Sequence, residues 1–144
     1  MKRYFSLVGI LVVAVVFIGC ATDSKQLILD DVQQVEVRSY QTRTYEQPKP
    51  AVLRAVVSTL QDLSFIADKV DMESGTVTAT KLTQRASLKI TIVAREKGDN
   101  ATNVRANAQF SSAGSMPKAV DDPETYNAFF TALDKAVFLD NEGI

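Results

Sequence analysis

The sequence predicts an α+β fold in which an antiparallel sheet of about five strands carries two helices packed on one face. Two observations lead to this prediction. Residues 87–111 form a hairpin pattern in which apolar and polar side chains alternate along both arms. Residues 51–63 and the stretch after Asp122 space their apolar residues along one face of a helix. Since a helical pattern stands before and after a run of strands, we expect both helices on the same face of the sheet.

The elements are expected in the order β-α-β-β-β-β-α. A segment rich in β-branched and aromatic residues predicts the first strand. Pro48 and Pro50 end this strand, because proline cannot continue a central strand, and Pro50 suits the first turn of a helix. The expected segments are a strand over 35–45, a helix over 51–63, strands over 65–70, 76–81, 87–96 and 103–111, and a helix that begins after Asp122.

The hairpin is the clearest element. Its first arm is expected to turn four residues toward the core, namely Leu88, Ile90, Ile92 and Ala94. Its second arm is expected to do the same with Val104, Ala106, Ala108 and Phe110. The turn at 97–100 contains Gly, Asp and Asn, which tolerate positive φ. One face of the sheet is therefore predicted to be buried, and the other to be open to water or to a partner.

The last helix has a strong start signal. Asp122 is expected to cap the helix, Pro123 to occupy its first position, and Glu124 to place negative charge at the positive end of the helix dipole. A wide apolar stripe follows, which we interpret as core: Tyr126, Phe129, Phe130, Leu133, Val137 and Phe138.

The N-terminal residues have the pattern of a secretion signal for a bacterial lipoprotein. A short positive start, Met1-Lys2-Arg3, precedes an apolar run of about fifteen residues, and Gly19 stands directly before Cys20. A small residue lets a signal peptidase reach the bond, and the Cys20 thiol is the nucleophile that accepts diacylglycerol. A transmembrane anchor is the alternative, but it needs about 20 apolar residues. Cys20 is therefore predicted to be the lipid-bearing first residue of the mature protein.

This interpretation sets the predicted organisation of the chain. Residues 1–19 are a lipoprotein signal peptide, residues 20–33 a lipidated tether, and residues 34–144 a single α+β domain. An aspartate after the lipidated cysteine favours the inner membrane of a Gram-negative envelope, so Ala21 predicts the outer membrane, with the domain on its periplasmic face. The diacylglycerol and N-acyl chains on Cys20 are the expected anchor, and no other cofactor is predicted.

The composition excludes several kinds of site. The chain contains one cysteine and no histidine, so it cannot form an internal disulfide, a Ser-His-Asp triad or a histidine-based zinc site. Without Lys2 and Arg3, the mature form has 14 basic and 17 acidic residues and a net charge of −3. Nucleic acid is therefore not an expected partner, because phosphate binding needs a clustered positive field. We predict no catalytic residue and no metal site.

Several strings resemble small Gram-negative envelope lipoproteins that are mainly uncharacterised. The strings span most of the mature chain and lie at 38–43, 60–65, 78–81, 127–130 and 135–139. The order of elements is also similar to the helix-grip domains of the NlpB/DapX-type lipoprotein of the outer-membrane β-barrel assembly machinery. This second resemblance is one of architecture and does not transfer a function. The first family has a longer apolar insertion after the lysine near position 81, where this chain has only 82–85.

Two groups of residues are candidates for contact with a partner. The first is a stripe on the expected first strand: Arg38, Tyr40, Thr42 and Arg43. The second lies on the wet face of the hairpin and consists of Lys89, Thr91, Arg95, Arg105, Asn107 and Gln109. In both cases the alternative is a solvated strand face held by cross-strand pairs.

Three functions are compatible with these patterns. The first is a non-catalytic, outer-membrane-anchored lipoprotein that binds or scaffolds another envelope component, with an envelope protein as the expected partner. The second is a carrier that holds a small apolar ligand or lipid between the sheet and the helices. The third is a hydrolase that uses Ser, Asp, Glu or Lys, for which the sequence offers no convergent polar cluster.

Overall fold

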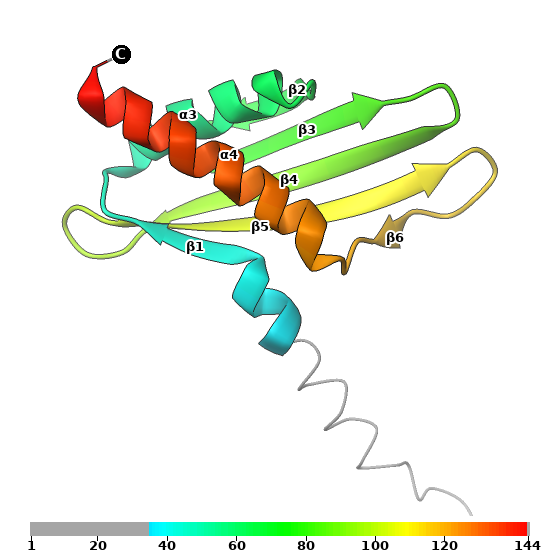
Figure 1. Cartoon of the computed structure of the whole chain (residues 1–144), viewed down its shortest axis with the longest axis horizontal. Coiled ribbons are helices and arrows are strands. Elements are labelled where there is room, and N and C mark those ends of the chain that lie inside the picture. The colour runs from blue at the N-terminus through cyan, green and yellow to red at the C-terminus, as the bar shows by residue number, and fades with distance from the viewer. Residues whose placement is uncertain (1–34, 144) are drawn as a thin grey trace, which may run out of the picture. The chain divides into compact units, whose positions relative to one another are not determined.

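The computed structural model describes residues 35–143. The predicted signal peptide, the lipidation site Cys20 and the tether lie outside the described residues. The α+β prediction is confirmed, since the described chain contains an antiparallel sheet together with helices (Figure 1). A helical segment over 35–40 comes first. The following elements are β1 (Thr42–Tyr45), α3 (Lys49–Asp62), β2 (Ile66–Asp71), β3 (Thr76–Leu82), β4 (Ala86–Glu96), β5 (Thr102–Ser112), β6 (Lys118–Ala119) and α4 (Pro123–Glu142).

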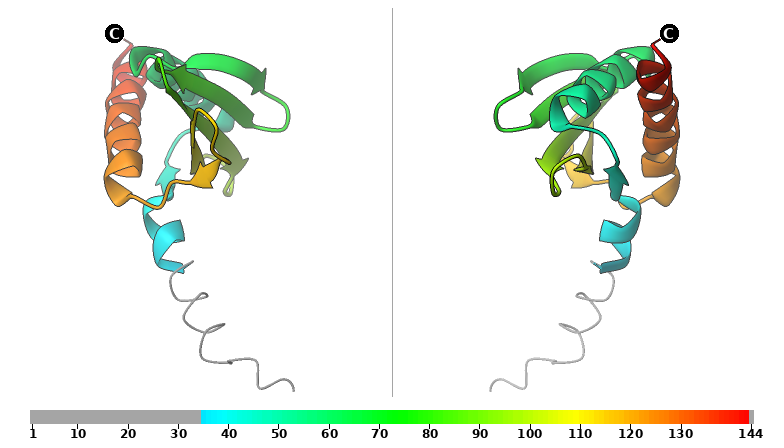
Figure 2. Two further views of the ribbon diagram at one scale, coloured as in Figure 1. Left: turned by 90° about the vertical axis from the view of Figure 1, so that its right-hand side faces the viewer. Right: turned by 90° about the vertical axis from the view of Figure 1, so that its left-hand side faces the viewer.

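The sheet has the strand order β1-β5-β4-β3-β2, and β6 adds to β5. The β2–β5 strands form a meander of consecutive antiparallel pairs. Along the other edge of β5, β1 pairs with Thr102–Arg105 and β6 with Gln109 and Phe110. Helices α3 and α4 lie on the same side of the sheet (Figure 2). The opposite side of the sheet carries none of the described helices.

The core lies between the helices and the meander, as the hairpin pattern predicts. Ile92 stands opposite Ala106, and Ile90 opposite Ala108, so large and small side chains alternate across the β4–β5 pair. Helix α3 turns its apolar face onto these strands, and α4 contributes most of its aromatic stripe. Among the largest fully buried side chains are Tyr126, Phe130, Leu53, Leu60, Ile92, Leu133, Val52 and Val56.

The first predicted strand, 35–45, is correct only in its last four residues. Residues 35–40 are helical, and only Thr42–Tyr45 is a strand. Residues 35–40 do not form a strand because the edge of β5 that they would join is already occupied. A longer β1 would have to pair with β5 beyond Ala106, but β6 and the Val120 N–H, which donates to the Ala108 carbonyl, occupy that part of the edge. With no ladder to join, 35–40 satisfies its own backbone locally, and the Gln41 N–H donates to the Val37 carbonyl.

Two residues assigned to the core are exposed. The Phe110 side chain lies on the helix side of the sheet beside Leu88, as its register requires, but 47% of Phe110 is accessible. The expectation for Phe138 is also wrong, because 62% of it is accessible. Each helical residue turns about 100° from the previous one, so Phe138, five residues after Leu133, lies about 140° around the helix from it.

The predicted start of the last helix is confirmed. The Asp122 carboxylate accepts hydrogen bonds from the backbone N–H groups of Glu124 and Thr125, and Pro123 occupies the first turn. The Thr125 hydroxyl and the Glu124 N–H hold the pKa of Asp122 below its ordinary value, because they stabilise the charged form. The helix ends at Gly143, which adopts φ +71° and donates its N–H to the Leu139 carbonyl.

The turn between β2 and β3 packs closely against β4. Gly75 adopts φ +72°, and its carbonyl accepts a hydrogen bond of 2.8 Å from the Ala94 N–H. A Cβ atom at this position would lie 2.2 Å from the Ala94 carbonyl oxygen. Both the backbone conformation and the close approach therefore require glycine here.

A tyrosine hydroxyl completes the edge of β5 between β1 and β6. The Tyr126 hydroxyl accepts a hydrogen bond from the Ala108 N–H at 3.1 Å and donates one to the Val120 carbonyl at 2.7 Å. The Gln41 carbonyl accepts from the Ala106 N–H at 2.9 Å in the same edge. Three separate chain segments therefore satisfy the backbone of one strand.

Candidate functional site

The candidate site is the sheet face that lies opposite α3 and α4, which we call the open face. Cross-strand register places side chains of β1, β3, β4 and β5 there in rows, for example Lys89 beside Gln109 and Thr91 beside Asn107. The open face is formed by Thr42, Thr44, Thr76, Thr78, Thr80, Leu82, Ser87, Lys89, Thr91, Val93, Arg95, Asn103, Arg105, Asn107, Gln109 and Ser111.

The open face is basic and rich in hydroxyl and amide groups. Its three cations are Lys89, Arg95 and Arg105, all exposed, and none of its positions on these four strands carries a carboxylate. Lys89 and Arg95 are six residues apart on β4, so their backbones are about 20 Å apart along the strand. The edge strand β2 adds Lys69 and Asp71 to the same face, since they stand opposite Thr78 and Thr76. Asp68 on β2 also accepts a hydrogen bond of 2.6 Å from the Thr80 hydroxyl.

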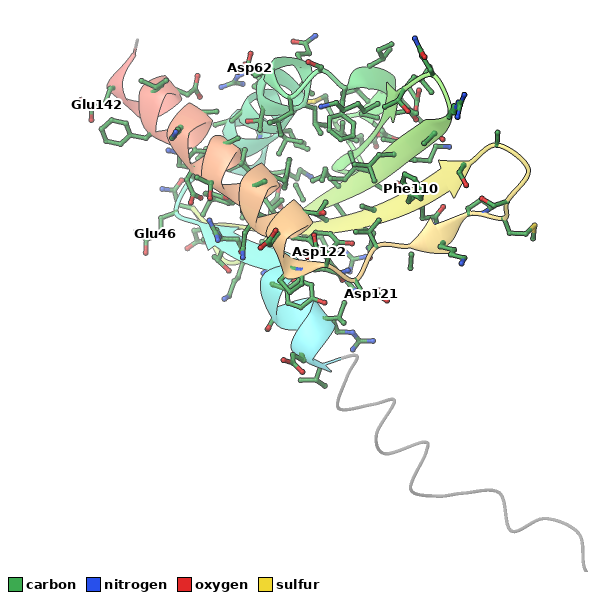
Figure 3. The ribbon with its side chains drawn as sticks, turned by 45° about the vertical axis from the view of Figure 1, so that its right-hand side comes forward. Glu46, Asp62, Phe110, Asp121, Asp122 and Glu142 are labelled. Atoms are coloured by element: carbon green, nitrogen blue, oxygen red, sulfur yellow. The ribbon has the colours of Figure 1, made fainter. Side chains whose placement is uncertain are left out.

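Further acidic side chains lie on the helix side and at the ends of the molecule. Helix α4 has one basic residue, Lys135, and four acidic ones, Glu124, Asp134, Asp140 and Glu142. Figure 3 shows Asp62 on α3 and Asp121 and Asp122 before α4 on this same side. The β4–β5 rows of the open face therefore carry cations without carboxylates and favour a neutral polar or anionic partner, whereas the β2 edge of the same face is acidic.

The structure brings together seven of the ten candidate contact residues. Lys89, Arg95, Arg105 and Asn107 all project from the β4–β5 pair onto the open face and are exposed. Thr91 and Gln109 complete the same rows, as the alternating pattern predicts. Thr42 joins them from β1, because it stands opposite Arg105.

Arg38 and Tyr40 are not part of this surface. Both lie in the helical segment 35–40 rather than on a strand, and Arg38 is exposed there. The Tyr40 ring packs on Tyr126, with 5.7 Å between centroids, and its hydroxyl donates to the Asp121 carbonyl at 2.6 Å. Desolvation and the nearby Asp121 charge raise the pKa of Tyr40 above its ordinary value. Tyr40 therefore fastens the helical segment to the start of α4.

Arg43 also has a structural role. Its guanidinium forms an ion pair with Asp134 and lies 5.0 Å above the centre of the Phe130 ring. The Tyr45 hydroxyl donates to the other Asp134 oxygen at 3.0 Å, and burial followed by Asp134 raises the pKa of Tyr45. This cluster joins β1 to α4. Sequence patterns could not reveal it, because Asp134 lies 91 residues from Arg43.

The interior offers little support for a ligand carrier, because the large core side chains fill the space between sheet and helices. The hollows lie on the outer surface instead. One of them has a volume of about 680 Å³ and follows the outside of α4 beside α3, where Asp62, Ala132 and Leu139 contribute to its lining. It gathers no set of groups in which a nucleophile meets a base.

Two further features of the described residues concern metals and membranes. Over 35–143, no three Cys, Asp or Glu side chains come together in a way that would hold a metal ion. Within the same part of the chain, no helix has both the length and the apolar character that crossing a bilayer requires.

Comparison with known proteins shows the fold alone. The sequence matches no known protein family and no curated protein. One similar structure is the adenylate sensor from AMP-activated protein kinase in complex with 5-aminoimidazole-4-carboxamide 1-beta-D-ribofuranotide, with 11% identity, a TM-score of 0.50, and coverage of 67% of this chain and 94% of the other. Another is a DUF4468 family protein from Bacteroides ovatus ATCC 8483, with 7% identity, a TM-score of 0.44, and coverage of 67% and 84%. Neither bears on the resemblance to envelope lipoproteins, which stays a prediction.

Proposed function

We propose that this chain is the precursor of an outer-membrane lipoprotein whose domain faces the periplasm and binds another envelope component without catalysis. The proposed localisation rests on the N-terminal sequence, where a positive start, an apolar run and Gly19-Cys20 have the order that lipidation requires. Acyl chains on Cys20 supply the anchor, since several chains hold a protein on a membrane more stably than one.

Metabolic labelling with palmitate tests the proposed lipidation and membrane anchoring. We expect the wild-type protein to incorporate label and to sediment with membranes. The Cys20→Ser variant should incorporate none, because serine lacks the thiol that accepts diacylglycerol. A Ser24→Ala variant of the predicted tether is the matched control and should behave as wild type. Wild-type protein that stays unlabelled would contradict the proposed anchor.

The open face is the observation that supports a binding role. It spans four strands, exposes Lys89, Arg95 and Arg105 among hydroxyl and amide side chains, and has no carboxylate on those strands. Such side chains can donate hydrogen bonds to a partner along the length of two central strands. The partner that fits best is an envelope protein with a complementary polar or acidic surface.

In-cell photo-crosslinking tests the binding role. A photoreactive residue is placed at Lys89 or Arg105 on the open face, or at Arg54, which is exposed on α3, as the control. We expect one dominant envelope protein to be trapped from the first two positions and not from Arg54. Tyr40 is left unchanged, because its hydroxyl is bonded within the domain. The absence of a crosslinked protein at both Lys89 and Arg105, or the same crosslinked proteins from Arg54, would contradict the proposal.

A further inference from the structure

One end of the sheet extends beyond the two helices and carries two neighbouring loops, which we call the sheet tip. The first loop joins β3 to β4, and the second joins β5 to β6 (Figure 1). The Ala113 N–H donates to the Arg85 carbonyl at 3.1 Å, so the loops lie side by side. The sheet tip is defined by Leu82, Arg85, Phe110, Met116 and Lys118.

Large apolar side chains are exposed on different sides of the sheet tip. Met116 in the second loop is 82% accessible, and Leu82 at the end of β3 is 67% accessible. Leu82 lies on the open face, whereas Phe110 lies on the helix side, near the end of β5 (Figure 3). Side chains that point outward on several sides of a narrow end do not form one continuous patch, whereas a stable interface with a folded protein buries about 800 Å² on each partner.

Basic side chains accompany these apolar ones. Arg85 and Lys118 are both exposed, and neither takes part in the ion pairs found among the described residues. Residues 81–95 and 103–120 contain no acidic residue. Apolar side chains flanked by cations are the combination that binds the interface of an anionic bilayer.

Hydrogen bonds hold both loops in shape. Thr83 and Ala86 exchange bonds across the first loop, where the Thr83 N–H donates to the Ala86 carbonyl at 2.8 Å. In the second loop the Ser115 N–H donates to the Ser112 carbonyl at 3.0 Å, and their hydroxyls lie 2.8 Å apart. Leu82 and Met116 are thus presented on ordered turns, which lowers the entropic cost of docking.

We propose that the sheet tip docks on an anionic phospholipid surface, with Leu82 and Met116 inserted among the headgroups and Arg85 and Lys118 paired with lipid phosphates. The inference rests on the proposed lipid anchor. Residues 21–34 connect Cys20 to the described domain and could span at most about 50 Å when fully extended. An anchored domain therefore meets the bilayer at a high effective concentration, so that a weak tip contact is sufficient.

Vesicle flotation tests the apolar contribution. The mature chain from residue 20 is used with Cys20→Ser, so that no acyl chain contributes to binding. At a high lipid concentration, which replaces the effective concentration that the anchor would supply, we expect it to float with vesicles of phosphatidylethanolamine and phosphatidylglycerol, and not with pure phosphatidylcholine. L82S/M116S should weaken binding about tenfold. The matched control V35S/F138S removes two side chains of similar exposure elsewhere and should leave binding unchanged.

The same assay tests the cations. R85A/K118A should weaken binding about tenfold, and added salt should reduce wild-type binding in the same direction. R54A/K97A removes two exposed cations away from the sheet tip and is the control for net charge. Equal effects of the two pairs would overturn the proposed site, because general attraction of the whole domain would then explain binding.

A fluorescent label tests the docking geometry directly. Cys20 is the only cysteine, so Cys20→Ser allows a single nitrobenzoxadiazole label at M116C or at F138C. We expect a blue shift on anionic vesicles at position 116 and none at position 138. No shift at 116, or the same shift at both, overturns the inference. Neither result depends on palmitate labelling or on crosslinks from the open face, so the proposed function can fail or hold separately.

Discussion

Replacing Gly75 with alanine should lower the free energy of unfolding by about 2–5 kcal/mol. Two costs add up. For an L-residue at φ +72°, the left-handed conformation costs roughly 1–2 kcal/mol. The new Cβ would also lie 2.2 Å from the Ala94 carbonyl oxygen, and such overpacking costs about 1–3 kcal/mol more. Because the clash strikes the backbone of β4 rather than a flexible side chain, the turn has to move away from the strand.

Gly98→Ala provides a matched control for this prediction. Gly98 lies in the β4–β5 turn and has the same φ of +72°, but a Cβ added there would meet no atom within 4 Å beyond its own chain neighbours. Its substitution should therefore cost only the conformational share, roughly 1–2 kcal/mol. Urea unfolding of both variants in the Cys20→Ser mature chain measures the difference. Equal losses would show that the β2–β3 turn does not approach Ala94 as closely as described.

Replacing Tyr126 with phenylalanine should cost about 2–3 kcal/mol of stability, although only one oxygen atom is removed. The hydroxyl is the sole described partner of the Ala108 N–H and also donates to the Val120 carbonyl. Tyr126 is 1% exposed and Ala108 is 3% exposed, so water cannot easily replace these bonds. The loss comes from leaving a buried donor unpaired rather than from lost packing, since the ring remains.

Tyr40→Phe is the corresponding control. Its hydroxyl makes one bond, to the Asp121 carbonyl, in an exposed position where water can take its place. The loss of stability should therefore be clearly smaller than for Tyr126→Phe. Hydrogen exchange gives a second measurement, because the Ala108 amide should lose protection in the Tyr126 variant alone. Unchanged protection at Ala108 would show that the tyrosine hydroxyl does not close the β5 edge.

Local signals explain which parts of the fold could be predicted from the sequence. The alternation of residues 87–111 determines both the faces and the register of a hairpin, and so it predicted the open face and six of its candidate residues. The start of α4 was predictable for the same reason, because Asp122 and Pro123 act on their immediate neighbours. Each of these features depends on residues a few positions apart.

The errors arise where distant segments compete or meet. Residues 35–40 have strand-like composition, but β6 takes the edge of β5 that they would need. Phe110 and Phe138 are apolar, yet the first lies beyond the cover of the helices and the second points away from the stripe. The Arg43–Asp134 pair joins elements from opposite ends of the domain's sequence, and no local pattern could reveal it. The sheet tip could not be predicted from the sequence either, because it is formed by two loops some thirty residues apart.

The shared edge of β5 has a consequence for the order in which the domain is assembled. The β2–β5 meander joins neighbours in sequence, so it can form soon after these residues are available. Thr42–Tyr45 instead pairs with Thr102–Arg105, and the Tyr126 hydroxyl comes later still. In a chain delivered from its N-terminus, β1 therefore stays unpaired until most of the domain has arrived. The segment nearest the proposed anchor would be among the last to lock into the native structure.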